Sequence, residues 1–101
     1  MSSSATATTE ALAQDVHVTE DALIVELVDG RTVSVPVSWY PRLLHGSIEE
    51  RNDWRLIGRG EGVHWARIDE DISVADLLAG RGSGEAQDSL RRWLESRKND
   101  G

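Results

Sequence analysis

Residues 60–80 read GEGVHWARIDEDISVADLLAG, and this stretch decides the fold of the chain. Its glycine-rich start leads into residues 63–68, an apolar and aromatic run that we interpret as a strand. The acidic residues 69–71 form a polar turn, and Ser73 stands three residues before Asp76 in the pattern that caps a helix N-terminus. The stretch therefore predicts a strand, a turn and a short helix.

The apolar side chains of this unit are expected to build the core of the protein. The chain has four Trp, one Tyr and no Phe, so much of the buried area must come from tryptophan. We interpret all four tryptophans as structural residues first. The core residues expected from residues 60–80 are Trp65, Ile68, Val74 and Leu77.

Three apolar runs upstream alternate with polar residues, as half-buried strands do. They lie within residues 16–18, 23–28 and 33–35, and Pro36 marks the end of the third run because it cannot donate to a ladder. Asp29-Gly30 joins the last two runs and is typical of a type I′ hairpin turn. The runs predict a three-stranded antiparallel meander.

The rest of the chain reads as helical. Ser38 and Pro41 begin one short helix that stops at Gly46, and Ser47 with Glu50 forms a capping box for a second that extends toward Trp54. Apolar residues from 86 to 97 recur at helical spacing. The predicted fold class is α+β: a small antiparallel sheet, built from the N-terminal meander plus one later strand, packs with short helices and a C-terminal amphipathic helix.

Composition divides the chain into three parts. Residues 1–13 are rich in Ser, Thr and Ala and are expected to form a disordered tail, because they carry too little apolar surface to offset the entropy of ordering. Residues 14–82 are expected to form a compact α+β domain, since 101 residues suit one core. Residues 83–101 are expected to form the C-terminal helix and tail.

The charge balance favours a basic partner. The chain has 18 acidic and 11 basic residues, a net charge of −7, whereas phosphate binding needs clustered Lys and Arg. Nucleic acid is therefore a poor ligand for the isolated domain. The absence of cysteine agrees with a reducing compartment, and no run is long enough to cross a bilayer, so a cytoplasmic location with no membrane partner is expected.

The glycines and acids of residues 58–80 do not match known ligand loops. A dinucleotide fingerprint needs a third glycine where Val63 stands, followed by a helix, and the Walker ending is missing. A calcium loop that started at Asp69 would need Gly at position 74 and Glu at position 80, where the chain has Val74 and Gly80. We interpret the glycines as a tight turn and the acids as a turn before a helix cap.

Catalytic and metal patterns are also missing from the sequence. There is no cysteine and no GxSxG elbow, so an enzyme is not expected, and neither is a cofactor. His17, His45 and His64 are scattered, so a metal site would require convergence in the tertiary structure, and surface histidines are the simpler interpretation. No metal site is assigned.

Three segments together resemble a small bacterial family. They are the Asp29-Gly30 hairpin, the stretch PVSWYPRLLHGSIEERNDWRLIGRGEGVHWARIDEDISVADLLAG and the closing SGEAQDSLRRWLESR. They resemble domain of unknown function 2442 over residues 16–97, most specifically in the GxGVHWxxIDEDI segment. The resemblance implies a compact α+β domain and an antitoxin-like partner of another small family, numbered 4160, with no catalytic residues.

We therefore expect a small non-enzymatic interaction module, in the antitoxin role of a toxin–antitoxin pair, that binds a small basic toxin. The acidic turn would steer the partner and the C-terminal helix would anchor it. The residues predicted to bind the partner are Asp69, Glu70, Asp71, Leu90, Trp93 and Leu94.

Two other classes stay open. An accessory transcriptional regulator or nucleic-acid-associated domain would act through its arginines, which are Arg51, Arg55, Arg59, Arg91 and Arg92. A small-ligand or metal-binding protein would act through His64 and Asp71.

Overall fold

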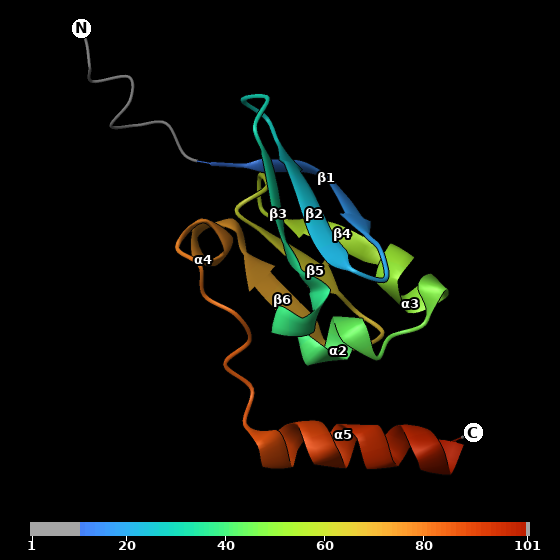
Figure 1. Cartoon of the computed structure of the whole chain (residues 1–101). Helices are drawn as coiled ribbons and strands as arrows, with labels where there is room; N and C mark the ends of the chain where they lie inside the picture. The colour runs from blue at the N-terminus through green and yellow to red at the C-terminus, as the bar shows by residue number, and fades with distance from the viewer. Residues whose placement is uncertain (1–10, 101) are drawn as a thin grey trace, which may run out of the picture.

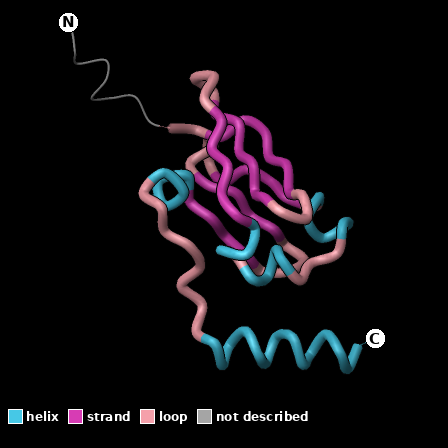
Figure 2. The backbone as a smooth tube through the Cα atoms, in the orientation of Figure 1, coloured by secondary structure: helices cyan, strands magenta, loops and turns pink. Residues whose placement is uncertain are grey.

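The protein is an α+β domain built on two small antiparallel sheets (Figures 1 and 2). The structure is a computed structural model that describes residues 11–100, with side chains to residue 98. The first sheet has the order β1-β2-β3, with strands β1 (Ala13–Val18), β2 (Ala22–Leu27) and β3 (Thr32–Pro36). The second has the order β4-β5-β6, with strands β4 (Trp54–Ile57), β5 (Gly62–Trp65) and β6 (Glu70–Ser73).

Short helices connect and flank the sheets. They are the 3₁₀ turn η1 (Val37–Trp39) and the α-helices α2 (Pro41–Leu44), α3 (Ile48–Asn52), α4 (Val74–Leu78) and α5 (Gln87–Asp100). The serine caps predicted at Ser47 and Ser73 mark the starts of two of them correctly. Ser47 and Glu50 exchange side-chain and backbone hydrogen bonds at α3, and the Ser73 hydroxyl accepts from the Asp76 N–H at α4.

The predicted fold class and the N-terminal meander are confirmed, with one correction to the hairpin turn. A type I′ turn needs two residues with positive φ. Among residues 11–98, Asp69 is the sole non-glycine residue with positive φ, so Asp29 does not adopt this conformation. Gly30 alone does, at 97°, and its N–H donates to the Leu27 carbonyl.

The one later strand that the sequence predicts is the centre of a full sheet. It ends at Trp65 instead of Ile68, and it pairs with β4 on one side and β6 on the other. Helix α3 stops at Asn52, so Trp54 begins β4, and Glu70 and Asp71, expected in a turn, belong to β6. Pairing with β5 overrides the low strand propensity of these acids, which sequence alone does not reveal.

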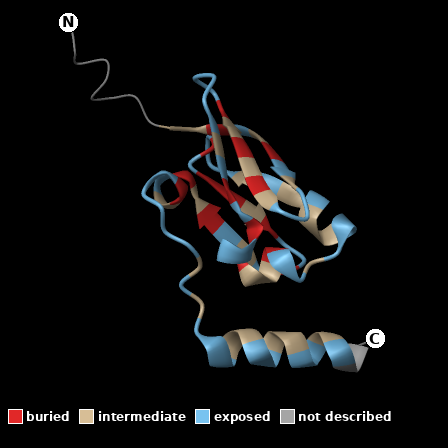
Figure 3. Ribbon diagram, viewed as in Figure 1, coloured by how far each residue is buried: buried red, intermediate tan, exposed pale blue. Residues whose placement is uncertain are grey.

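The apolar faces of both sheets meet in one core (Figure 3). Trp65, Ile68, Val74 and Leu77 are each at most 3% exposed, which confirms the predicted core residues. The indole N–H of Trp65 donates to the Arg51 carbonyl at 3.0 Å, so the largest core side chain has its polar atom satisfied.

A backbone hydrogen bond joins β1 to the loop between β4 and β5 of the second sheet. The Ala13 N–H donates to the Gly60 carbonyl at 2.8 Å, and Ala13 is 2% exposed. The expected tail of residues 1–13 therefore ends earlier, because β1 begins at Ala13 and Leu12 already accepts a hydrogen bond from the Val28 N–H. Residues 1–10 of that predicted tail lie outside the described residues.

Candidate functional site

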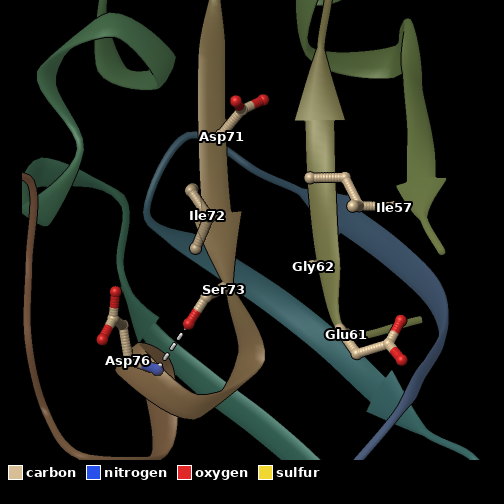
Figure 4. A pocket seen from close by; sticks show the side chains of 7 residues that line it. All are labelled: Ile57, Glu61, Gly62, Asp71, Ile72, Ser73 and Asp76. Atoms are coloured by element: carbon tan, nitrogen blue, oxygen red, sulfur yellow. Dashed lines mark hydrogen bonds between the residues drawn. The ribbon is translucent and has the colours of Figure 1, made fainter. Parts of the chain in front are cut away.

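The described part of the chain contains a hollow on the outer face of the second sheet (Figure 4). It has a volume of about 270 Å³ and lies where β4, β5, β6 and the start of α4 meet. We call it the acidic hollow. Its lining residues are Ile57, Glu61, Gly62, Asp71, Ile72, Ser73 and Asp76.

The acidic hollow is open because the central residue of its floor, Gly62, has no side chain. Ile57, Gly62 and Ser73 lie side by side across three strands, so glycine occupies the central position of an outward-facing row. A Cβ on Gly62 would meet the Ile72 carbonyl oxygen at 3.0 Å and the Ile57 Cδ1 at 3.3 Å. The space above the central strand therefore stays open because residue 62 is glycine.

Carboxylates form the rim of the acidic hollow. Glu61 accepts a hydrogen bond from the Arg59 N–H at 2.7 Å, and backbone N–H donors, its own first and then that of Arg59, hold the pKa of Glu61 below its ordinary value. Asp76 pairs with Arg81 at 3.0 Å on the surface. Glu61 stays ionised, and the Arg59 guanidinium lies beside it at 3.8 Å, so each of these two rim carboxylates has an exposed arginine partner.

Asp71 lies next to His64 on the outward face of β5 and β6. The two are cross-strand partners, and the His64 Nδ1 hydrogen-bonds to Asp71 Oδ1. The side chain of Asp71 is 67% exposed, so it keeps most of its surface toward solvent. Within residues 11–98 no third histidine or carboxylate completes a metal-ligand set with this pair.

The predicted acidic turn is divided between two faces of β6. Asp71 points outward into the hollow, whereas Glu70, its neighbour, is half-buried beside the core. Burial raises the pKa of Glu70 to about 7, with nearby Glu85, Asp71 and Asp69 adding to the effect and Arg42 opposing it. Asp69 is exposed with a φ of 53° in the tight turn before β6.

Of the predicted helix residues, Trp93 packs against the core of its own domain. Leu90, Trp93 and Leu94 are all half-buried on α5. The guanidinium groups of Arg42 and Arg97 lie 5.0 and 4.5 Å from the Trp93 ring centroid. Trp93 therefore contributes to docking α5 on the domain, whereas Leu90 and Leu94 are half-buried on the same helix.

Arg42 connects the acidic turn to the C-terminal segment. It donates to the Ile68 carbonyl at 2.8 Å and pairs with Glu85 at 2.6 Å, with both side chains 14% exposed. The two predicted surfaces thus lie on either side of one arginine.

The sequence did not predict that Ile57, Glu61, Gly62, Ser73 and Asp76 line the acidic hollow. The alternation of residues 54–57 was the signal that could have placed Ile57 on the outward face of a strand.

Two arginines of the nucleic-acid alternative, Arg51 and Arg91, are engaged within the protein. Arg51 donates to the Leu43 and Leu44 carbonyls, both at 2.9 Å, and so satisfies the end of α2. Arg91 pairs with Asp88 at 2.9 Å on α5.

In the described part of the chain, no helix has the length and apolar character needed to cross a membrane.

Two solved structures are similar to this chain, while no curated protein matches it in sequence. One is the crystal structure of a protein of unknown function from Rhodospirillum rubrum ATCC 11170. It is 27% identical with a TM-score of 0.67, over 78% of this chain and 98% of that chain. The other is the solution NMR structure of an uncharacterized protein from Chromobacterium violaceum, 22% identical with a TM-score of 0.61, over 72% and 70% of the two chains.

The second similarity shows the fold alone, and both concern proteins without an assigned activity. A family model described as "Protein of unknown function (DUF2442)" matches residues 13–83, which include both sheets and the acidic hollow. The protein therefore belongs to this family.

Proposed function

We propose that this protein is a non-enzymatic interaction module that binds a small basic protein through the acidic hollow. One observation carries the proposal: three carboxylates, on Glu61, Asp71 and Asp76, gather around the hollow in a chain whose net charge is −7. An acidic surface of this kind steers a basic partner and fixes its orientation.

The hollow suits a single Lys or Arg side chain. Its apolar floor, with Ile57 at 39% exposure, would take the aliphatic stem, and the rim carboxylates would take the charged head. The volume of about 270 Å³ is below that of a typical small-molecule pocket, which favours a protein side chain as the occupant.

The antitoxin role is the specific form of this proposal. An antitoxin neutralises its toxin by binding it, so it needs a complementary surface and no catalytic groups. The acidic charge fits a small basic toxin, and the resemblance of residues 16–97 to the family partnered with family 4160 supports the same role.

Co-purification tests the proposal directly. We expect a small basic protein to be encoded beside the gene of this chain; the two are co-expressed, and the affinity of the pair is measured by calorimetry at 50 and 300 mM NaCl. We expect a complex that weakens with salt, and Glu61→Gln with Asp71→Asn together to weaken it at least tenfold. Asp88→Asn together with Glu95→Gln on α5 is the matched control, since it also removes two carboxylate charges and both residues are exposed outside the hollow. An absence of binding, or equal affinity for both variants, contradicts the proposal.

A further inference from the structure

The structure brings together three potential metal ligands that are separate in the sequence. Asp15 and His17 lie two residues apart on β1, and Glu26 lies on the neighbouring strand β2. One ligand atom from each lies within 4.8 Å of the other two. This group is on the first sheet, apart from the acidic hollow on the second.

A β-bulge creates this arrangement. The register of β1 against β2 shifts between Ala13 and Asp15, so that Asp15 lies opposite Glu26. The extra residue lets Ala13 and Val16 both point into the core, at 2% and 4% exposure, and turns Asp15 and His17 outward together. Without the bulge, strict alternation would put Asp15 on the same face as Ala13.

The distances match those of a metal site. His17 Nε2 lies 3.3 Å from Asp15 Oδ2 and 3.1 Å from Glu26 Oε2. With Zn²⁺ bonds of about 2.0–2.1 Å, neighbouring tetrahedral ligands lie about 3.3 Å apart. Two edges of a tetrahedron are therefore already formed, and small rotations of the carboxylates close the third.

A backbone hydrogen bond orients the Asp15 carboxylate, and the two carboxylates have His17 as their shared ion-pair partner. Asp15 Oδ1 accepts a hydrogen bond from the Val16 N–H at 2.9 Å, which leaves Oδ2 directed at His17. Within residues 11–98, the ion pairs of both carboxylates are made with His17 alone. Two carboxylates thus share one imidazole, and a divalent cation would balance them.

We propose that Asp15, His17 and Glu26 form a Zn²⁺ site with one nitrogen and two oxygen ligands, which joins β1 to β2. Imidazole together with carboxylate favours zinc over Mg²⁺, which prefers oxygen ligands alone. The side chains are 47%, 52% and 42% exposed, so water can supply the fourth ligand. Because the unfolded chain lacks the site, bound Zn²⁺ stabilises the fold.

The test uses the untagged full-length chain, first treated with a chelator and then titrated with ZnCl₂. We expect the thermal midpoint to rise by at least about 4 °C at saturation. Amide NMR signals of residues 15–18 and 26 should shift with a stoichiometry of one zinc per chain. His17→Gln should abolish both effects. Glu26→Gln provides a second variant should His17→Gln fail to fold.

Two other histidines provide matched controls. His45→Gln and His64→Gln each remove one imidazole outside the group, and both variants should keep the full zinc response. The proposal is overturned if the parent shows no response at 1 mM Zn²⁺, if Mg²⁺ produces the same shift, or if His64→Gln removes the response while His17→Gln retains it.

Discussion

Arg97 donates a bidentate pair of hydrogen bonds to Glu50, at 2.7 and 2.9 Å, across 47 residues of sequence. Glu50 Oε1 also accepts the Ser47 N–H at 2.8 Å, so one carboxylate both caps α3 and anchors the far end of α5. Hydrogen bonding to Arg97, then to the Ser47 backbone, lowers the pKa of Glu50 to about 2 despite its partial burial.

Arg97→Ala should release the C-terminal helix. The change removes the ion pair and one of the two cations that stack on Trp93, and we expect it to lower the free energy of unfolding by about 1–2 kcal/mol after allowing for partial exposure of the pair. Amides of α5 should then lose protection against hydrogen exchange. Arg91→Ala is the control, since the pair with Asp88 is exposed and its loss should cost less than about 0.5 kcal/mol.

The pH dependence of the same variant gives an independent check. The pKa of Glu50 is lowered in the folded state, so its contribution is present above its unfolded value of 4.5 and is lost as the pH falls toward 2. The parent and Arg97→Ala should therefore converge in stability across this window. Equal hydrogen-exchange protection of α5 in both proteins would show that the ion pair does not hold the helix.

Local patterns predicted the fold where neighbouring residues decide it. The caps Ser47-Glu50 and Ser73-Asp76 begin helices because each is completed within four residues, and alternation placed the N-terminal meander. The strand β6 could not be predicted in this way. Its acidic sequence EDIS is unfavourable in a strand, and it forms because Ile72 is buried and the whole segment pairs with β5.

The candidate site was harder to predict because its floor depends on Gly62, a residue without a side chain. The acids at 69–71 were visible in the sequence, but strand pairing decides that Asp71 faces the hollow while Glu70 turns away. Gly62 appeared as one glycine of a turn, and its role depends on having Ile57 and Ser73 as cross-strand neighbours. Those cross-strand contacts form only when the three strands pair in the folded protein, so the local sequence pattern does not reveal them.

Gly60→Ala should be strongly destabilising. Gly60 has a φ of 115°, and a Cβ there would meet the Ala13 carbonyl oxygen at 2.5 Å. The substitution adds backbone strain and pushes β1 away from the second sheet, so we expect a loss of at least about 2 kcal/mol in chemical denaturation. Gly30→Ala separates the two effects: its φ is 97°, but nothing lies within 4 Å of the added Cβ. A loss in Gly60→Ala no greater than in Gly30→Ala would exclude the steric contribution.

Gly62→Ala should fill the acidic hollow at small cost to the fold. Gly62 has no positive φ, and the new methyl group would sit 3.0 Å from a carbonyl oxygen and 3.3 Å from Ile57 Cδ1. We expect a change in stability of about 1 kcal/mol. Affinity for the basic partner, measured by calorimetry, should fall at least tenfold. Gly84→Ala is the control, because an added Cβ there meets nothing within 4 Å. Unchanged affinity in the Gly62 variant would place the partner elsewhere.

Glu70→Gln should stabilise the protein at alkaline pH and have little effect in acid. Burial raises the pKa of Glu70 to about 7 in the folded state, above 4.5 in the unfolded chain. Between these values the folded state binds more protons, so the free energy of unfolding falls as the pH rises. Glutamine removes that slope, and we expect the variant to exceed the parent by about 1–3 kcal/mol at pH 8 and to match it at pH 4.

Urea denaturation at pH 4, 6 and 8 measures this difference. Glu95→Gln is the matched control, since Glu95 is an exposed glutamate on α5, away from Glu70. If Glu70→Gln and the parent keep parallel profiles from pH 4 to 8, the pKa of Glu70 is the same in the folded and unfolded states, and Arg42 must offset the combined effect of burial and the neighbouring carboxylates.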